Sequence, residues 1–294
     1  MNLQKVLFFL LSIGGSTLLA APSGGNVIQG KADFHVAKQG LQIKAADQTV
    51  IQWQDFSIGK GEFVKFVQPH SDATVVNRVI SDQLSEIYGS LKANGHVYLI
   101  NPAGIVVGAE GLIQAAGFIA STFDFTKSKE GMVFKGDSKA IIVNEGQIET
   151  PNGDVFLIGY QVVNEGEIHG KTVGLAGGSE VLLKPAGSER LFVKAEQRIP
   201  TSGTAVENKG TIEALKTELK GDGNAFSYAI KNDGLIEATR LYEENGEIFL
   251  LSEGGVVSHG GTLIAEGGEV RLLGHTVELK EGSLIDVSHD TKPG

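Results

Sequence analysis

Short runs in which apolar and polar residues alternate follow one another along most of the chain, and glycine separates the runs. The most regular runs have the pattern Gly-x-Val/Ile-x-Leu-Ile/Leu, and copies begin at Gly95, Gly153, Gly246 and Gly268. The third and fifth residues of each copy are apolar and share one face of a strand, because side chains alternate across a β-strand. The pattern therefore predicts many short strands with one buried face.

A second repeat, Asn-x-Gly-x-Ile, begins at Asn144, Asn164, Asn208 and Asn232. Asn tolerates a left-handed backbone and Gly accepts a positive φ, so the first three residues of each copy predict a turn. Self-similarity with a period of 20–24 residues is typical of a solenoid. The isoleucines that end the copies are predicted to form one buried ladder: Ile148, Ile168, Ile212 and Ile236.

Together the repeats predict an all-β chain that folds from about residue 24 onwards as a right-handed parallel β-helix. We expect a cap at its N-terminus and some strands outside the helix. The face opposite the buried ladder is expected to be solvent-exposed, because Arg271 stands where the other copies have Tyr98, Phe156 and Phe249. A leucine-rich horseshoe is disfavoured because its leucine frame is missing, whereas a β-sandwich or a propeller stays open as an alternative.

The N-terminus has the features of a secretory signal peptide. Lys5 supplies a positive charge, residues 6–19 form an apolar run, and Ala20 and Ala21 offer small residues for cleavage. We expect residues 1–20 to be removed, with the mature chain beginning near Ala21. A membrane anchor is the weaker alternative, because the run is shorter than the ~20 residues that a spanning helix needs.

Composition narrows the chemistry that the chain can perform. It contains no cysteine, so disulfides and thiolate metal sites are excluded. The net charge is −10, with both signs mixed along the sequence, which argues against nucleic acid as a partner. Its seven histidines show no paired spacing, and we predict neither a metal site nor a cofactor.

An ordered series of motifs over residues 24–126 resembles the secretion domain of two-partner secretion exoproteins, the filamentous haemagglutinin family. The motifs are Gly25-Asn-Val-Ile-Gln-Gly30, Ile51-Gln-Trp-Gln-Asp-Phe-Ser-Ile-Gly59, Phe66-Val-Gln-Pro69, Val76-Asn-Arg-Val79, Ile87-Tyr-Gly-Ser-Leu-Lys-Ala-Asn-Gly95, Val97-Tyr-Leu-Ile-Asn-Pro-Ala-Gly-Ile105 and Gly117-Phe-Ile-Ala-Ser-Thr122. A further family motif, Asn-Pro-Asn-Leu, is absent. The resemblance is therefore nearer to the adhesin-type branch, with the high-molecular-weight adhesins and the haem–haemopexin utilisation proteins.

The resemblance implies a function in export. An outer-membrane β-barrel transporter would recognise the chain through its periplasmic domains, and the chain would cross unfolded and fold outside a Gram-negative cell. It would be secreted or held at the cell surface, serving adhesion to a host or cell-surface receptor. Residues 21–140 would be the secretion domain, and residues 141–294 would continue the same solenoid.

The family hallmark Asn-Pro-x-Gly-Ile corresponds to Asn101, Pro102, Ala103, Gly104 and Ile105. Pro102 fixes its own φ and favours an extended Asn101, and Gly104 permits a tight bend. The motif is our candidate for transporter recognition, although a purely structural turn is an equal alternative.

Asn77 and Arg78 form a second candidate for recognition. Their alternatives are a buried turn residue for Asn77 and an ordinary exposed residue for Arg78.

Two other functions stay open. A β-helical enzyme that degrades polysaccharides would gather carboxylates on one outer face, and Asp222, Asp233 and Glu237 are candidates, although we predict no enzyme. Kinship with haem–haemopexin utilisation proteins also suggests a module that binds a haem carrier.

Overall fold

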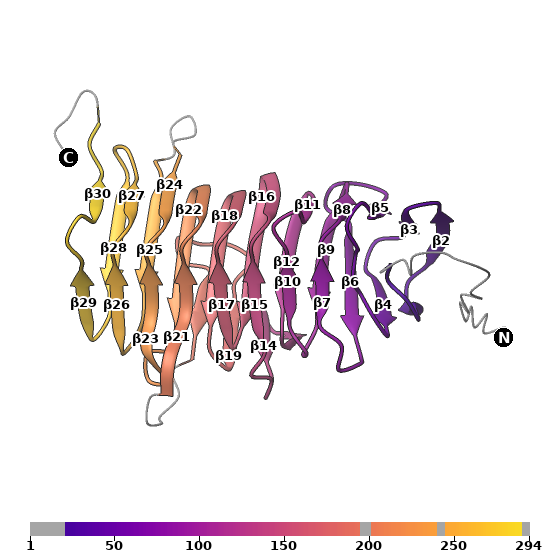
Figure 1. Cartoon of the computed structure of the whole chain (residues 1–294), viewed down its shortest axis with the longest axis horizontal. Coiled ribbons are helices and arrows are strands. Elements are labelled where there is room, and N and C mark those ends of the chain that lie inside the picture. The colour runs from indigo at the N-terminus through magenta and orange to yellow at the C-terminus, as the bar shows by residue number, and fades with distance from the viewer. Residues whose placement is uncertain (1–20, 195–200, 240–244, 290–294) are drawn as a thin grey trace.

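The computed structural model describes residues 21–194, 201–239 and 245–289 as an elongated stack of β-coils (Figure 1). The predicted signal peptide, residues 1–20, lies outside the described residues. Within the described ranges, no helix is long and apolar enough to cross a bilayer.

Three sheets contain all the strands of the described residues. The largest comprises β1 (Asn26–Gln29), β2 (Ala32–Ala37), β3 (Gly40–Ala45), β4 (Thr49–Trp53), β5 (Phe63–Val67), β6 (Thr74–Val79), β8 (Ser90–Ala93), β9 (His96–Ile100), β11 (Leu112–Gln114), β12 (Gly117–Ser121), β16 (Gln147–Gly159), β18 (Glu167–Gly177), β22 (Thr211–Gly221), β24 (Leu235–Ala238), β25 (Glu247–Leu251), β27 (Thr262–Ile264), β28 (Glu269–Leu273) and β30 (Leu284–Asp286). The second comprises β7 (Ser85–Ile87), β10 (Ile105–Val107), β15 (Ile141–Asn144), β17 (Gln161–Asn164), β21 (Thr201–Asn208), β23 (Phe226–Asn232), β26 (Val256–His259) and β29 (Thr276–Leu279). The third comprises β13 (Asp124–Lys127), β14 (Met132–Lys135), β19 (Glu180–Leu183) and β20 (Leu191–Val193).

Each coil adds one strand to each of three parallel ladders. The first ladder runs through β5, β8, β11, the N-terminal halves of β16, β18 and β22, and then β24, β27 and β30. The second runs through β4, β6, β9, β12, the C-terminal halves of the same long strands, β25 and β28. The third is the eight-stranded sheet. The predicted parallel β-helix is therefore confirmed.

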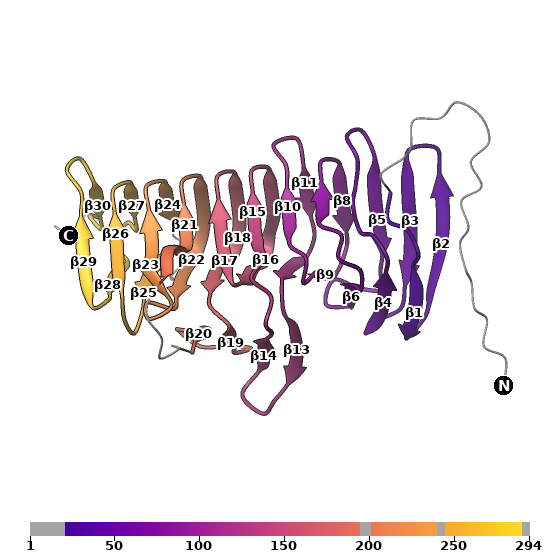
Figure 2. The same ribbon diagram turned by 60° about the horizontal axis from the view of Figure 1, so that its bottom comes forward.

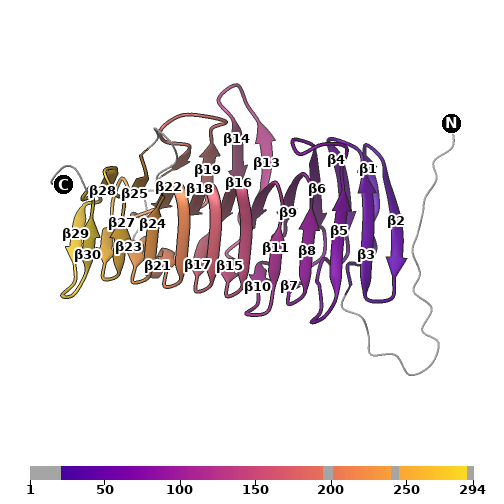
Figure 3. The same ribbon diagram turned by 90° about the horizontal axis from the view of Figure 1, so that it is seen from above.

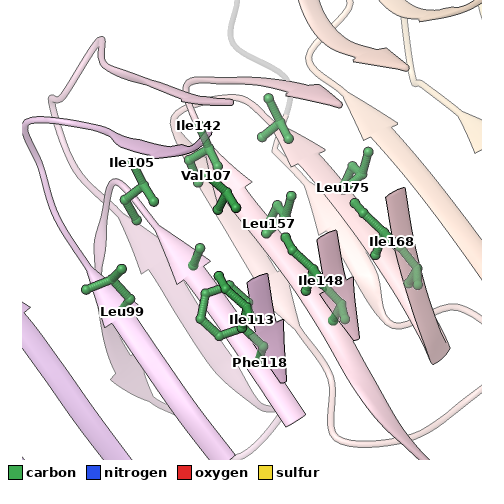
Figure 4. Close-up of a cluster of buried hydrophobic side chains, with 14 of the residues drawn as sticks. Leu99, Ile105, Val107, Ile113, Phe118, Ile142, Ile148, Leu157, Ile168 and Leu175 are labelled. Carbon is green, nitrogen blue, oxygen red and sulfur yellow. The ribbon is translucent and has the colours of Figure 1, made fainter. Parts of the chain in front are cut away.

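The inward side chains of the ladders form one continuous apolar core (Figure 4). The four predicted isoleucines pair in register and are fully buried, which confirms the predicted ladder. No break separates residues on either side of position 140, since β15 pairs directly with β10. The division of the chain at that position stays a prediction.

Antiparallel strands close the N-terminal end of the core. β1 pairs with β4 and β2 pairs with β3, both antiparallel, whereas β3 continues into the parallel ladder through β5. Phe34 on β2 stacks edge-on against Trp53, with ring centroids 5.7 Å apart. The predicted cap is thus a change of strand direction over the first coils.

The four-stranded antiparallel sheet lies outside the solenoid against the second ladder (Figures 2 and 3). Between them is a second apolar core, which includes Phe123, Phe134, Phe156 and Leu191. The expectation of a solvent-exposed face is therefore wrong for Phe156 and Phe249, each 1% exposed. The aromatic rings are covered by the extra sheet or by cations, and Arg271 itself lies 4.9 Å from the Phe249 ring centroid.

Residues 184–193, which lead into and include β20, contact three successive coils of the solenoid. Arg190 pairs with Asp154 on β16 and lies over the Phe156 ring at 4.8 Å. Leu191 lies over Gly174 on β18, where an added Cβ would be 2.5 Å from its Cδ1. The carboxylate of Glu218 on β22 accepts the backbone amides of Arg190 and Leu191 at 2.9–3.0 Å. We call residues 184–193 the strap.

The asparagines of the second repeat do not occupy turns. Each ends a strand of the third ladder with its side chain buried, and the Nδ2 of one donates to the Oδ1 of the next at 2.7–2.8 Å. Outside glycine, Gln48 alone among the described residues has a positive φ, so left-handed backbone is not the reason for asparagine here. The reason is a buried amide ladder in which Asn164, Asn208 and Asn232 each accept from the preceding asparagine, whereas Oδ1 of Asn144, the first member, has no hydrogen-bond partner in the described part of the chain.

The glycines of the same repeat are also required for a reason that differs from the prediction. They lack a positive φ, but a Cβ on Gly166, Gly210 or Gly234 would lie 2.0–2.2 Å from the carbonyl oxygen of the stacked glycine before it. Close approach of successive backbones is therefore the reason for glycine at these positions, because any side chain would force neighbouring coils apart.

Candidate secretion motif

Asn101 lies directly after β9, fully buried, at the corner that leads into β10. Its Nδ2 donates to the carbonyl oxygen of Gln83 and to Oγ of Ser85, both at 2.9 Å. Its Oδ1 accepts the backbone amide of Ala103 at 2.9 Å, and its own amide donates to the carbonyl of Ser121. The side chain thus ties the turn to the preceding coil, and the backbone ties it to the following one.

The rest of the motif shapes the bend. Pro102 is exposed and its carbonyl accepts Oγ of Ser138 at 2.6 Å, whereas Ile105 is fully buried in the core. Gly104 has a φ of 115°, and a Cβ there would lie 2.9 Å from Leu84 Cδ1. Of the five motif residues, only Pro102 is exposed in the folded domain, since Ala103 is half-buried and the other three are buried.

Asn77 is buried in the middle of β6 and not in a turn, so the turn alternative is wrong. Its Oδ1 accepts Nε1 of Trp53 at 3.0 Å, and its Nδ2 donates to the carbonyl of Tyr98 at 3.3 Å. The amide satisfies the buried indole N–H, a donor that would otherwise lose its water without replacement. Burial also raises the pKa of the Tyr98 phenol.

Arg78, the next residue, points outward and holds the extra-helical hairpin. Its guanidinium pairs with Asp124 at 2.9 Å and lies 5.6 Å from the ring centroid of Phe125, both on β13. Its side chain is 24% exposed, so it is not an ordinary surface residue. A groove of about 430 Å³, lined in part by Arg78, Tyr98 and Lys127, opens beside it.

Two of the three candidate catalytic carboxylates, Asp222 and Asp233, make structural contacts, whereas Glu237 lies on the outer face of β24. Asp222 is buried and its Oδ1 accepts the amides of Asn224 and Ala225. Asp233 pairs with Lys231 and Lys280, and these ammonium groups hold the pKa of Asp233 below its usual value against the opposing effect of burial. Across the described parts of the chain, no three His, Asp or Glu side chains form a group able to hold a metal ion.

Comparisons with known proteins identify the family of the chain. The TPS secretion domain, the defining domain of two-partner secretion exoproteins, matches residues 20–265. The chain belongs to the two-partner secretion family. Members leave the cell through the periplasm and an outer-membrane transporter, so this is a secreted or surface-exposed exoprotein of a Gram-negative bacterium.

Two heme/hemopexin-binding proteins of Haemophilus influenzae are similar to this two-partner secretion chain. One is 31% identical over 271 residues, covering 84% of this chain, and the other is 33% identical over 258 residues, covering 76%. The matches span only 29% and 26% of those relatives.

Solved structures show the same fold. The crystal structure of the HMW1 secretion domain from Haemophilus influenzae has a TM-score of 0.78 at 29% identity, covering 91% of this chain and 74% of that one. The filamentous hemagglutinin secretion domain has a TM-score of 0.66 at 13% identity, covering 90% of this chain and 98% of that one. The second likeness concerns the fold alone.

Sequence reasoning selected Asn101 and Arg78 but not the residues that hold them. Ser85 and Asp124 lie far from these residues in the sequence, and only the stacking of coils brings each pair together. The short apolar runs that form β14 and β19 lie outside both repeats, and they could have indicated strands outside the solenoid.

Proposed function

We propose that the transporter's periplasmic domains bind the segment around Asn101 while the chain is unfolded. After export, the same segment fixes the alignment of the first coils. The supporting observation is that Asn101 is 0% exposed and that its side-chain amide forms hydrogen bonds only within the domain. A folded domain cannot offer this side chain, so recognition through it must precede folding.

An Asn-Pro pair suits recognition in an unfolded chain. Proline fixes one backbone angle and restricts the residue before it, so this stretch loses less conformational entropy on capture than its neighbours. The free amide of Asn101 supplies two N–H groups and one oxygen acceptor that alanine lacks. After export, the same amide enters the contacts with Gln83 and Ser85.

The test compares Asn101→Ala with Ser85→Ala, each co-expressed with the partner transporter. Both remove the 2.9 Å contact between Asn101 and Ser85, and each is expected to cost about 1–3 kcal/mol of stability. We expect Asn101→Ala to be secreted poorly and Ser85→Ala to be secreted normally, although both purified domains fold. Normal secretion of Asn101→Ala would remove the recognition role, and equal loss in both variants would make the motif structural.

Asn77 and Arg78 form the second part of the proposal. Arg78→Ala and Asp124→Ala break the same ion pair of the folded state, but only the first removes the guanidinium from the unfolded chain. A loss of secretion confined to Arg78→Ala would support recognition. Equal secretion of the two variants would leave Arg78 with its folded-state function alone.

The export signal belongs to the same proposal. Residues 1–20 would be cleaved as a signal peptide, giving a mature chain that begins near Ala21. Intact mass measurement of secreted protein tests this, and a secreted chain that retains Met1 would contradict it.

For the activity of the exported protein, we propose binding at a cell surface, with adhesion as one form. A haem carrier is the second candidate ligand, favoured by the similarity to heme/hemopexin-binding proteins. Capture of haem-loaded hemopexin by the purified chain, compared with binding to host cells, distinguishes them. An enzyme acting on polysaccharides is disfavoured because Asp222 and Asp233 are engaged in structural contacts.

A further inference from the structure

Outward side chains of the first ladder form a straight row along the solenoid. One residue from each of seven successive strands lies in register with the next. In order from the N-terminal end, this outer row is Lys65, Lys92, Gln114, Glu149, His169, Glu213 and Glu237. Neighbouring strands are about 4.8 Å apart, so the row is about 29 Å long.

Charge is segregated along the outer row. Lys65 and Lys92 stand side by side at one end, and Glu213 and Glu237 stand side by side at the other. Among the described residues, Lys65, Lys92 and Glu237 have no ion-pair partner within 4.0 Å. Like charges that face each other across a sheet repel, so each end of the row gains from an opposite charge supplied by another molecule.

The centre of the row is polar and internally paired. Nε2 of Gln114 donates to Glu149 at 2.7 Å, and Nδ1 of His169 lies 2.9 Å from Glu213. The face is also uncovered within the described structure: the extra-helical sheet lies against the second ladder, away from β5, β8 and β11 in all three views (Figures 1, 2 and 3). An uncovered sheet face is therefore available to a partner.

We propose that this face binds a second copy of the chain, with the two solenoids antiparallel. The outer row is its own electrostatic complement when reversed about Glu149. Lys65 then faces Glu237 of the second copy, and Lys92 faces Glu213. Gln114 faces His169. The two-fold symmetry repeats each contact, so the two kinds of Lys–Glu pair give four ion pairs in total.

A second outward row on the same strands fits the same arrangement. Its members are Phe63, Ser90, Leu112, Gln147, Glu167, Thr211 and Leu235. Reversal about Gln147 places Phe63 on Leu235 and Ser90 on Thr211, with only Leu112 on Glu167 mismatched. A parallel arrangement would instead bring lysines onto lysines and glutamates onto glutamates.

Charge reversal tests the pairing in the purified folded chain by sedimentation velocity. We expect reversible dimers with a Kd below about 1 mM, weakened as salt approaches about 0.5 M. Lys65→Glu with Lys92→Glu, and separately Glu213→Lys with Glu237→Lys, should each weaken association more than about tenfold. An equimolar mixture of the two double variants should associate again, because the heterodimer restores every opposite-charge pair.

The position of the two-fold axis has its own test. Because the chain lacks cysteine, Glu149→Cys introduces a single thiol at the axis, and a short bis-maleimide should link two copies. Lys65→Cys should not link to itself, since the two positions lie at opposite ends. Glu149→Gln removes a like-charge contact at the axis and should tighten the dimer about 1.5- to 5-fold.

Several results would overturn the proposal. A wild-type chain that stays monomeric at about 1 mM excludes the dimer. Dimers that persist in both double variants, or a mixture that fails to recover association, exclude this face. Efficient linking of Lys65→Cys to itself identifies a parallel arrangement and excludes the antiparallel one.

Discussion

Nδ2 of Asn232 donates to Nδ1 of His259 at 3.2 Å, and this contact ends the buried ladder of asparagines. Because Asn232 supplies the N–H, Nδ1 is the acceptor, and Nε2 carries the proton that it donates to the carbonyl of Leu284 at 3.2 Å. The His259 ring therefore links the ladder of asparagine side chains to the backbone of the last described coil. Both residues are 0% exposed.

The first prediction concerns this end of the ladder. His259→Ala removes the ring acceptor of Asn232 Nδ2 and the ring donor to the carbonyl of Leu284, and should lower the free energy of unfolding by about 1–3 kcal/mol. His259→Asn continues the ladder by one member and should recover at least half of that loss. Urea unfolding with hydrogen exchange over residues 256–286 measures both. Equal losses would show that the ring is retained for its volume and not for its acceptor.

The second prediction concerns the stacked glycines. Gly210→Ala places a Cβ 2.0 Å from the carbonyl oxygen of Gly166, so the two coils must separate locally. We expect a cost of at least about 1–3 kcal/mol in thermal or urea unfolding. Lys209→Ala, at the adjacent exposed position, removes only surface ion pairs with Glu165 and Glu207 and should cost less than about 1 kcal/mol. Similar costs for the two would contradict close backbone approach as the reason for glycine.

The third prediction concerns the contact between Leu191 of the strap and Gly174 of β18. Gly174→Ala should push away both Leu191 and Phe156, whose Cδ1 atoms would each lie 2.5 Å from the new Cβ, and Leu191→Ala should leave a cavity that costs about 2–5 kcal/mol. In the double variant the new methyl group partly fills that cavity, so its total cost should be smaller than the sum of the single costs. A double-mutant cycle by urea unfolding measures this coupling, and strictly additive costs would contradict the contact.

The fourth prediction is a pH dependence carried by Glu218. Burial is the main effect and raises the pKa of this carboxyl, although the amides of Leu191 and Arg190 act in the opposite direction. A folded-state pKa above the unfolded value means that the folded state binds the proton more tightly. The stabilisation from Glu218 is therefore fully present below the unfolded value, near 4.5, and is lost as pH rises through the folded pKa.

Glu218→Gln removes this titration and provides the comparison. Wild type should gain stability relative to Glu218→Gln as pH falls from neutral, with the difference constant above the folded pKa and below 4.5. The variant should also lose about 1–3 kcal/mol at neutral pH, because its amide replaces one acceptor oxygen. Unfolding curves between these limits measure the difference, and a pH-independent difference would show that Glu218 does not titrate in this window.

The two repeats were sufficient to predict the solenoid and its ladder. Period-2 patterning assigns Ile148, Ile168, Ile212 and Ile236 to one face, and a 20–24-residue period places them in successive coils. The motif around Asn101 was also found from sequence, because Asn-Pro and Gly impose local backbone limits. Such features depend on residues that are near one another in the chain.

Other features could not be obtained in this way. Leu191 and Glu218 each fit a strand pattern alone, and nothing in the sequence indicates that one covers β18 and the other binds the strap. The segregation of charge along the outer row, from Lys65 to Glu237, also could not be predicted, since its members come from seven strands at irregular intervals in the sequence.

The amino-acid sequence by itself therefore determined the strand period, the buried ladder, the export family and the candidate motif. These follow from alternation of side chains and from local backbone restrictions, which act over a few residues. The tertiary structure alone decided that Asn101 is buried, that Arg78 holds β13, and that a second core lies under the extra-helical sheet. Each depends on the distance between residues that only coil stacking brings together, and no local rule specifies that distance.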